Sequence, residues 1–395
     1  MAIRLGICSG LALAALVIGP ARADFASCLA ELRSAAAAQG ISAATFDRTM
    51  RGVTPDPKVI EAMDAQPEFK TPIWDYLASL VDDQKVSEGR EKMRQYSSAL
   101  ASAEQRYGVD RFAVAAVWGV ESDYGNIFGK WSLPQSLSTI ACTGQRRRDY
   151  FRGELMSALK IVDRGDIAPE KLRGSWAGAF GHTQFMPSTY LRLAVDGDGD
   201  GRRDLVESVL DALHSTANYL AKAGWVTGAS WGYEVCVPAG YSGPSGRTNR
   251  QSVDSWSSRG LRKIDGGALS GAGQAGLLLP AGASGPGFLV FKNYDAAYSY
   301  NGADSYALAI SLLSDRLRGK SGVQTPWPTN DPGISRAERK ELQSLLLRRG
   351  YQIGEPDGAI GALTRGAVAD YQTKIGVERN GHAGRLVLDA LRAGR

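Results

Sequence analysis

Histidine and cysteine are scarce in this sequence of 395 residues, which contains three histidines and four cysteines. The cysteines stand far apart, at positions 8, 28, 142 and 236. Structural zinc sites need cysteine and histidine ligands in closely spaced pairs. A metal centre with thiolate and imidazole ligands is therefore not expected.

A large excess of charge of either sign is also absent. The 46 basic residues exceed the 41 acidic ones by five, so the formal net charge is +5. Domains that bind nucleic acid usually carry a strong basic patch or stripe. A balance this small argues against a nucleic-acid partner, although a weakly positive protein suits an anionic polymer.

Long hydrophobic runs are missing as well, apart from a short one near the N-terminus. Arg4 precedes the apolar stretch Leu11–Ile18, and the small-x-small motif Ala21-Arg22-Ala23 follows it. This order of features is typical of a cleaved export signal, and the run is too short to span a membrane comfortably. We expect residues 1–23 to be a signal peptide. The mature chain is expected to begin near Asp24, outside the cytoplasm and without a transmembrane segment.

Export would remove one cysteine and leave Cys28, Cys142 and Cys236. In an oxidising compartment we expect one disulfide and one free thiol, and the sequence leaves the pairing open. Lipid anchoring at Cys28 also stays open. It is disfavoured, because Phe25-Ala26-Ser27 is a poor lipobox and Asp24 interrupts the apolar segment.

Apolar residues recur at three- and four-residue spacing from Phe25 to about Arg318, which predicts a mainly helical region. Glycine-rich stretches interrupt it, most clearly residues 266–287. The apolar runs at 277–279 and 288–291 are either strands or buried coil, which periodicity does not decide. The predicted helices include residues 29–37, 98–107, 112–120, 154–162 and 205–221.

A segment without periodicity, residues 319–333, is rich in proline, glycine, threonine and asparagine and is predicted to be a linker. Residues 334–395 beyond it form a compact helical unit. Ser335 is expected to cap a first helix and Thr364 a second, with a third from about Arg385 to Leu391. Two successive turn-then-helix units indicate an internal repeat.

Glu121 is the first candidate for chemistry. Asp110 can cap a helix with the body Phe112–Val120, which places Glu121 near the C-terminal end, where the helix dipole disfavours a carboxylate. Trp118 and Tyr124 are apolar neighbours in sequence. Partial burial without a cation would raise the pKa of Glu121 and make it a proton donor. The alternative is a surface glutamate that closes a helix.

The glycine-rich segment from Gly174 to Ser188 is the second candidate. Small residues permit close backbone approach. Ser175 and Gln184 offer neutral donors and acceptors of the kind that hold sugar hydroxyl and acetamido groups. A tight turn packed between helices explains the same pattern equally well.

An acidic loop, residues 196–207, is the third candidate. It fits the calcium pattern D-x-[DN]-x-[DN]-G-x5-E at every fixed position, with Gly201 at the sharp turn. The alternative is a loop without an ion, in which the aspartates pair with Arg202 and Arg203. The expected oxygen ligands are Asp196, Asp198, Asp200, the Arg202 carbonyl, Asp204 through water, and Glu207.

Together these segments resemble the lytic murein transglycosylases of the membrane-bound B type, over nearly the whole mature chain. The C-terminal unit resembles the small three-helix peptidoglycan-binding domain, with Leu342-Gln343, Pro356-Asp357-Gly358, Thr364-Arg365 and Tyr371-Gln372. Further matches are Gln66-Pro67-Glu68-Phe69, Trp74-Asp75-Tyr76, Arg146-Arg147-Arg148, Ala217-Asn218-Tyr219-Leu220, Gly224-Trp225, Leu279-Pro280-Ala281-Gly282, Tyr300-Asn301 and Ser305–Ala309.

The resemblance implies a mainly α fold. A lysozyme-like catalytic domain with a minor β part would span residues 24–318, followed by the linker and the peptidoglycan-binding domain. It implies a periplasmic enzyme that acts on peptidoglycan glycan strands, with Glu121 as the sole acid and base. It also implies a structural Ca²⁺ in the acidic loop, where Asp211 competes with Glu207 as the last ligand. The matching groove residues are Ser175, Gln184, Tyr219, Tyr300 and Asn301.

Two positions depart from the family pattern. His182 stands where glutamine is usual, which puts subsite contacts in doubt. Asn380 stands where the tail usually repeats aspartate, which is expected to weaken its second turn.

The reaction implied explains how one carboxylate suffices. Most glycosidases need two carboxyl groups. Here Glu121 would protonate the bond between N-acetylmuramic acid and N-acetylglucosamine and then deprotonate the muramic 6-hydroxyl, which closes a 1,6-anhydro ring. Asp123 is interpreted as a structural cap, with a second catalytic role as the alternative.

Three other functions stay open at this stage. A hydrolytic muramidase would use the same fold with a positioned water, and a non-catalytic wall-binding protein would depend on the tail alone. A calcium-dependent adhesion protein would explain only the acidic loop. Endo- or exo-cleavage, oligomeric state and protein partners cannot be derived from the sequence.

Overall fold

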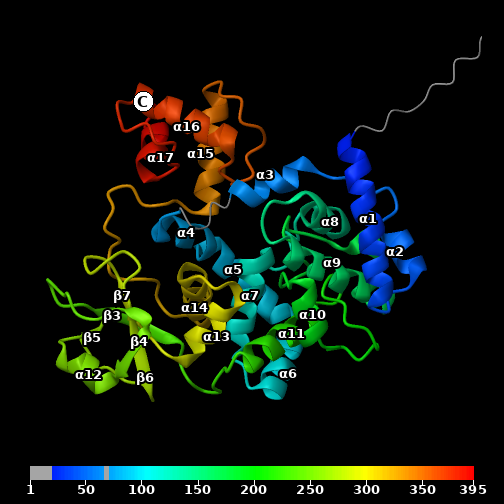
Figure 1. The fold of residues 1–395 in the computed structure, drawn as a ribbon. Coiled ribbons are helices and arrows are strands. Elements are labelled where there is room, and N and C mark those ends of the chain that lie inside the picture. Colours follow the sequence, from blue (N-terminus) through cyan, green and yellow to red (C-terminus); the bar gives the residue numbers. More distant parts are fainter. Residues whose placement is uncertain (1–19, 66–70) are drawn as a thin grey trace, which may run out of the picture.

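The computed structural model describes residues 20–65 and 71–395 (Figure 1). Most of the expected signal peptide and the motif Gln66-Pro67-Glu68-Phe69 lie outside these ranges. Within them, no helix is both long and apolar enough to cross a bilayer. The described chain is mainly helical, as predicted.

The helical body contains the five helices expected between residues 29 and 221. The last of them begins at Val209 and not at Leu205, because residues 205–207 form a turn. The helices of this body are α1 Pro20–Ala38, α2 Ala43–Thr49, α3 Pro57–Ala65, α4 Ile73–Leu80, α5 Asp83–Gln95, α6 Ser97–Tyr107, α7 Arg111–Ser122, α8 Leu133–Thr143, α9 Arg148–Asp163, α10 Pro187–Leu193, α11 Val209–Lys222, α13 Lys292–Asn301 and α14 Asp304–Arg318. A short 3₁₀ turn at Pro169–Lys171 and a two-stranded pair, β1 Trp131–Ser132 with β2 Arg173–Gly174, complete it.

The central helix of the body is α7. Asp110 caps it by accepting a hydrogen bond from the Phe112 amide, as the sequence predicts. All seven residues from Ala113 to Gly119 are buried. A helix that is apolar on every side must be surrounded by other elements, and α7 indeed packs against α5, α6, α11 and α14.

The two apolar runs left undecided by periodicity are strands β6 and β7. They form the middle of a five-stranded antiparallel sheet with the order β4-β6-β7-β3-β5. Leu277 and Leu289 are paired in register and pack against α12 (Val253–Ser258), while Leu278 and Phe288 join the core of the helical body. Both faces are covered, which explains the lack of alternation. The strands are β3 Gly232–Cys236, β4 Gly246–Ser252, β5 Arg262–Lys263, β6 Gln274–Leu278 and β7 Gly287–Val290.

The C-terminal unit consists of α15 Arg336–Arg348, α16 Ala362–Lys374 and α17 Arg385–Arg392 around its own core. Ser335 caps α15 in a full capping box, as predicted. The prediction that Thr364 caps α16 is wrong. Gly361 precedes the helix, and Thr364 is buried in its first turn, where its hydroxyl accepts a hydrogen bond from Gln343.

The internal repeat in this unit is present in its hydrogen bonds. Gln343 accepts from the Gly358 amide at 2.7 Å and donates to Asp357 at 3.1 Å. In the second copy Gln372 accepts from Gly381 at 2.8 Å and donates to Asn380 at 2.8 Å. Asn380 therefore makes the same contacts as aspartate does in the first turn.

The cysteine pairing left open by the sequence is Cys28 with Cys142. This disulfide joins α1 to α8 across 114 residues of chain. Cys236 is exposed and carries a free thiol.

Candidate active site

Glu121 lies in the last turn of α7 and is half-buried. The hydroxyl of Tyr306, at the start of α14, donates a hydrogen bond to its Oε1 atom. Burial raises the pKa of Glu121 to about 8, although the hydrogen bond from Tyr306 acts in the opposite direction. A carboxyl group with this pKa is protonated at neutral pH and can act as a general acid.

Tyr306 is the site residue that the sequence analysis did not single out. It appeared only inside the family motif Ser305–Ala309, and it lies 185 residues from Glu121 along the chain. It is 3% exposed, and burial raises its pKa well above the ordinary value. The hydroxyl therefore stays protonated and acts as a donor toward Glu121.

Aromatic rings extend from this pair along one side of the site. The ring of Tyr300 stacks on that of Tyr306 with centroids 6.1 Å apart, and the ring of Tyr219 follows at 4.6 Å from Tyr300. Their hydroxyls are anchored, since Tyr300 donates to the Thr183 carbonyl and Tyr219 to the Ser299 carbonyl. The structure thus brings two of the expected groove residues next to Glu121 through Tyr306.

Asn301 ends α13 and is exposed, immediately after Tyr300. It is the most exposed of the five expected groove residues.

The glycine-rich segment crosses the body between β2 and α10. Gln184 has a positive φ of 49° and donates its Nε2 hydrogens to the carbonyls of Gly181 and Phe128, at 2.8 and 3.3 Å. These two bonds use the donor group of the amide and fix the orientation of the side chain. Ser175 accepts from the Ala179 amide through its hydroxyl, and both Ser175 and Gln184 are half-buried.

Small residues in this segment are required by packing. A Cβ atom on Gly174 would lie 2.0 Å from the Ala179 carbonyl oxygen. The structural interpretation of the segment, a tight turn packed between other elements, is therefore confirmed at Gly174.

His182 belongs to the same segment and is 8% exposed. Its Nδ1 atom accepts a hydrogen bond from the Trp118 indole at 3.1 Å, and its carbonyl accepts one from Ser122 at 2.5 Å. Burial lowers the pKa of His182 to about 4, so the ring is neutral at physiological pH. His182 thus ties the segment to α7, the helix that carries Glu121.

Asp123 directly follows α7 in a left-handed conformation and is the C-cap residue, as the sequence analysis favoured. Its two carboxylate oxygens are held by Lys85 and Arg336. Burial alone would raise the pKa of Asp123, but these two partners outweigh it and hold the pKa below the ordinary value.

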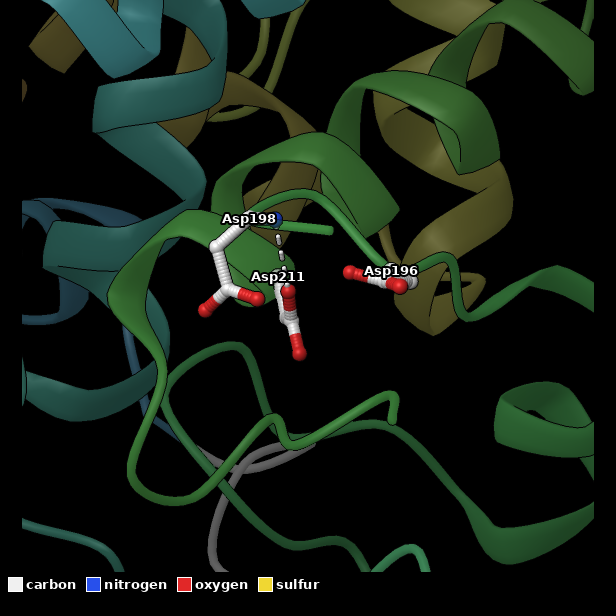
Figure 2. A group of neighbouring side chains, drawn as sticks. All are labelled: Asp196, Asp198 and Asp211. Atoms are coloured by element: carbon white, nitrogen blue, oxygen red, sulfur yellow. Dashed lines mark hydrogen bonds between the residues drawn. The ribbon is translucent and has the colours of Figure 1, made fainter. Parts of the chain in front are cut away.

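The acidic loop gathers carboxylates at the start of α11. Among the residues that the structure describes, ligand atoms of Asp196, Asp198 and Asp211 lie within 4.8 Å of one another (Figure 2). Asp211 also accepts from the amides of Gly197 and Asp204, at 2.8 and 2.6 Å, which fixes its orientation. Carboxylate oxygens are among the ligands that Ca²⁺ prefers.

The other expected carboxylate ligands are not part of this cluster. Asp200 pairs with Arg202, and Asp204 accepts from the amides of Val206 and Glu207. The Glu207 side chain is exposed and pairs with Lys171. The geometry therefore brings Asp211 and not Glu207 to the other aspartates.

The cluster and the aromatic rings beside Tyr306 are connected by α11. Asp211 and Tyr219 share α11 and are eight residues apart, which corresponds to about 12 Å along a helix axis. Tyr219 is itself two rings away from the Tyr306 hydroxyl.

Several known proteins are similar to this chain. Membrane-bound lytic murein transglycosylase B of Escherichia coli (strain K12) is 34% identical over 246 residues, which cover 61% of this chain and 66% of that protein. The structure of SltB3 from Pseudomonas aeruginosa in complex with NAG-anhNAM-pentapeptide is 43% identical. It has a TM-score of 0.75, covering 93% of this chain and 99% of that one. The Escherichia coli lytic transglycosylase Slt35 in complex with calcium is 29% identical, with a TM-score of 0.65, covering 75% of this chain and 92% of that one.

Two family models match. The peptidoglycan binding domain matches residues 335–391, which contain α15, α16 and α17. The transglycosylase SLT domain matches residues 24–315, well over half of the chain, and this range contains Glu121, Tyr306 and the acidic loop. The chain therefore belongs to the transglycosylase SLT domain family.

Proposed function

We propose that this protein is a lytic transglycosylase that cleaves the β-1,4 bond between N-acetylmuramic acid and N-acetylglucosamine in peptidoglycan. The observation that carries the proposal is Glu121, a half-buried carboxyl group whose pKa is raised to about 8 and whose polar contact is the Tyr306 hydroxyl. The similarity to SltB3, which was solved with an anhydro-muramic ligand, supports the same reaction.

In the first step Glu121 donates its proton to the glycosidic oxygen while the bond to muramic C1 breaks. The carbonyl oxygen of the substrate's own acetamido group stabilises the positive charge at C1. In the second step the ionised Glu121 takes the proton of the muramic 6-hydroxyl, and O6 bonds to C1. Glu121 ends protonated, no water is consumed, and the product is a 1,6-anhydro ring.

Tyr306 acts between the two steps. Its hydroxyl donates to Glu121, and a hydrogen bond to a carboxylate is stronger than one to the neutral acid. It therefore stabilises the enzyme while Glu121 is ionised.

Substrate contacts are proposed for the residues that the site places around Glu121. The Oε1 atom of Gln184 and the hydroxyl of Ser175 would bind sugar hydroxyl or acetamido groups. The rings of Tyr300 and Tyr219 offer apolar faces to a sugar, and Asn301 would contact the substrate at the outer end of the groove.

Mass spectrometry of the muropeptides released from purified peptidoglycan tests the proposed reaction. Products lighter by one water, without a reducing muramic end, are expected. Reducing ends would instead identify the protein as a hydrolytic muramidase on the same fold. A protein that pelleted with the wall and released nothing would be a binding protein.

Replacing Tyr306 with phenylalanine is expected to lower kcat and to move the alkaline limb of the pH profile upward. The hydrogen bond lowers the pKa of Glu121, so its removal leaves burial unopposed and the pKa rises above 8. A hydrogen bond to a charged group contributes about 1.5–3 kcal/mol, which corresponds to a loss of roughly 10- to 100-fold in kcat.

The matched control is Tyr294→Phe. Tyr294 is also buried, and its hydroxyl donates to the Asp304 carbonyl, one residue before the motif that contains Tyr306. The control is expected to leave the pH profile in place. An unchanged alkaline limb in Tyr306→Phe would contradict the assigned contact.

We also propose a structural Ca²⁺ held by Asp196, Asp198 and Asp211. The three carboxylates fit the ion, since each accepts hydrogen bonds from backbone amides and one ligand atom of each lies within 4.8 Å of the others. The calcium complex of Slt35 supports the choice of metal. The ion would be held by the acidic loop and the first turn of α11, and none of its three ligands is Glu121 or Tyr306, so we infer that it stabilises the loop and takes no part in the proton transfers.

Thermal unfolding with calcium and with a chelator tests this site. A ligand at one hundred times its Kd stabilises a protein by about 2.7 kcal/mol, or roughly 5 °C or more for a domain of this size. Asp211→Asn is expected to abolish the calcium-dependent rise in Tm, whereas Glu207→Gln keeps it. The reverse result would restore Glu207 as the ligand, and chelation that stopped turnover without lowering Tm would contradict a structural role.

Export to the periplasm is proposed, with cleavage of the signal peptide near Ala23. The disulfide between Cys28 and Cys142 supports an oxidising compartment. A disulfide-bonded Cys28 has no thiol left for a lipid, so we infer that the protein carries no anchor there. Mass spectrometry of the mature, non-reduced protein tests both points.

A further inference from the structure

The C-terminal domain contacts the catalytic domain at the end of α7. Arg336, the first residue of α15, donates through its guanidinium to Asp123 Oδ2 at 2.5 Å. Its backbone amide donates to Asp82 Oδ2 at 3.1 Å. Asp123 is two residues beyond Glu121, so the peptidoglycan-binding domain reaches the helix turn that carries the proposed acid.

The Asp123 carboxylate bonds to Lys85 in the catalytic domain and to Arg336 in the C-terminal domain. Lys85 Nζ bonds its other oxygen at 2.5 Å and the Gly119 carbonyl at 3.0 Å. The side chains of Lys85 and Asp123 are 8% and 10% exposed, and that of Arg336 is 29% exposed. An ion pair this buried is costly to break, because the remaining charge loses its partner away from water.

The chain beyond α7 is strained. Asp123 and Tyr124 are consecutive non-glycine residues with positive φ, 54° and 56°. Such a conformation costs about 1–3 kcal/mol per residue and persists only where its surroundings enforce it. The packing of the Tyr124 side chain is one restraint, because it lies directly against two glycines. A Cβ atom on Gly89 would lie 2.1 Å from the Tyr124 hydroxyl, and one on Gly119 would lie 2.6 Å from the Cζ atom. The ion pairs of Asp123 are the other.

The strained turn is hydrogen-bonded back to the last turn of α7, which carries Glu121. The amides of Asp123 and Tyr124 donate to the carbonyls of Gly119 and Trp118, at 3.2 and 3.3 Å. Glu121 lies within the turn that these two hydrogen bonds close. We expect a shift of Asp123 to move this turn and with it the Glu121 side chain.

We propose that Arg336 is a positioning residue for Glu121, acting through Asp123, so that the docked C-terminal domain completes the catalytic site as well as binding the wall. The inference rests on the proposed function. Without Arg336 one oxygen of Asp123 faces the domain boundary unpaired, and the carboxylate can turn toward water and release the strained turn. Other contacts between the two domains are expected to keep the C-terminal domain docked. His382 Nδ1 lies 3.4 Å from Asp75 Oδ2, and Gly333 packs against Asp75.

The test is steady-state kinetics of the full chain on short soluble glycan fragments, below the unfolding temperature of every variant. Arg336→Met is expected to lower kcat by about 10- to 100-fold with little change in KM, the size of effect that a small misplacement of a reacting group produces. Arg336→Lys is expected to recover most of the loss, because lysine can still pair with Asp123.

Arg392→Met is the control for general damage to the C-terminal domain. Arg392 forms a two-pronged pair with Glu341, and the partners given for it among the described residues, Glu338, Glu341 and Asp389, all belong to the C-terminal domain. It is expected to keep the wild-type kcat.

A double-mutant comparison shows whether the effect passes through Asp123. The variant with both Arg336→Met and Asp123→Asn is expected to lose no more kcat than Asp123→Asn alone. Additive losses, or a kcat of Arg336→Met within about twofold of the wild type, would overturn the inference. Glu121→Gln in the same assay separates the two proposals, because an active Glu121→Gln removes the proposed function itself.

Discussion

Replacing Glu121 with glutamine is expected to lower kcat on purified peptidoglycan by about 10³-fold, within the range that general acid–base catalysis contributes. Glutamine has nearly the same shape and can accept the hydrogen bond from Tyr306, but it cannot transfer the proton in either step. Release of soluble muropeptides measures the effect. Glu170→Gln, which changes an exposed glutamate in the 3₁₀ turn, is the control and should retain full activity.

The same variant is expected to be at least as stable as the wild type, and increasingly more stable as the pH rises. A carboxyl group whose pKa is higher in the folded than in the unfolded protein loses its stabilising contribution progressively as the pH rises from the unfolded value, about 4.5, to the folded value, about 8. Glutamine does not ionise and avoids this loss. Thermal unfolding between pH 6 and 9 measures the difference. Full lytic activity of a folded Glu121→Gln protein would show that the proposed mechanism is wrong.

Replacing Cys28 and Cys142 together with serine is expected to lower the free energy of unfolding by roughly 2–5 kcal/mol. The bond closes a segment of 114 residues, and it restricts the unfolded chain more strongly than a short loop would. It also holds α1 to α8, so the loss is expected to fall on the N-terminal part of the catalytic domain. Denaturant unfolding of the two forms measures the change.

Cys236→Ser is the control for the loss of a thiol. Cys236 is exposed and unpaired, so its replacement is expected to leave the midpoint of unfolding unchanged. Adding a reductant should reproduce the effect of the double replacement in the wild type. A wild-type midpoint that did not respond to the reductant would contradict a stabilising role for the bond.

Features that depend only on residues close together in the chain could be predicted from the sequence. Asp110 and Ser335 were identified as helix caps because the acceptor and the amide that it binds are two or three residues apart. The repeat in the C-terminal domain was visible because each copy has a turn motif, Asp357-Gly358 or Asn380-Gly381, shortly before a helix. Thr364 was misassigned because Gly361 and Thr364 both suit a helix start, and only the packing against Gln343 distinguishes them.

The predictions for the candidate site also divide into those that depend on nearby residues and those that depend on tertiary contacts. Glu121 was found because the end of an apolar helix is an unfavourable place for a carboxylate, which is a local argument. The choice between Glu207 and Asp211 was not local, since it depended on how α11 begins relative to the loop. The strands β6 and β7 were left undecided because a strand buried on both faces has no alternation to detect.

The sequence by itself determined the helical class, the division into two units, the proposed acid and the acidic loop. Only the tertiary structure decided that Tyr306 binds Glu121, that Cys28 pairs with Cys142 and that Arg336 reaches Asp123. These pairs are 185, 114 and 213 residues apart. Their contacts depend on the packing of whole helices and domains, which no spacing along the chain encodes, whereas caps, turns and periodic faces arise within one or two turns of the backbone.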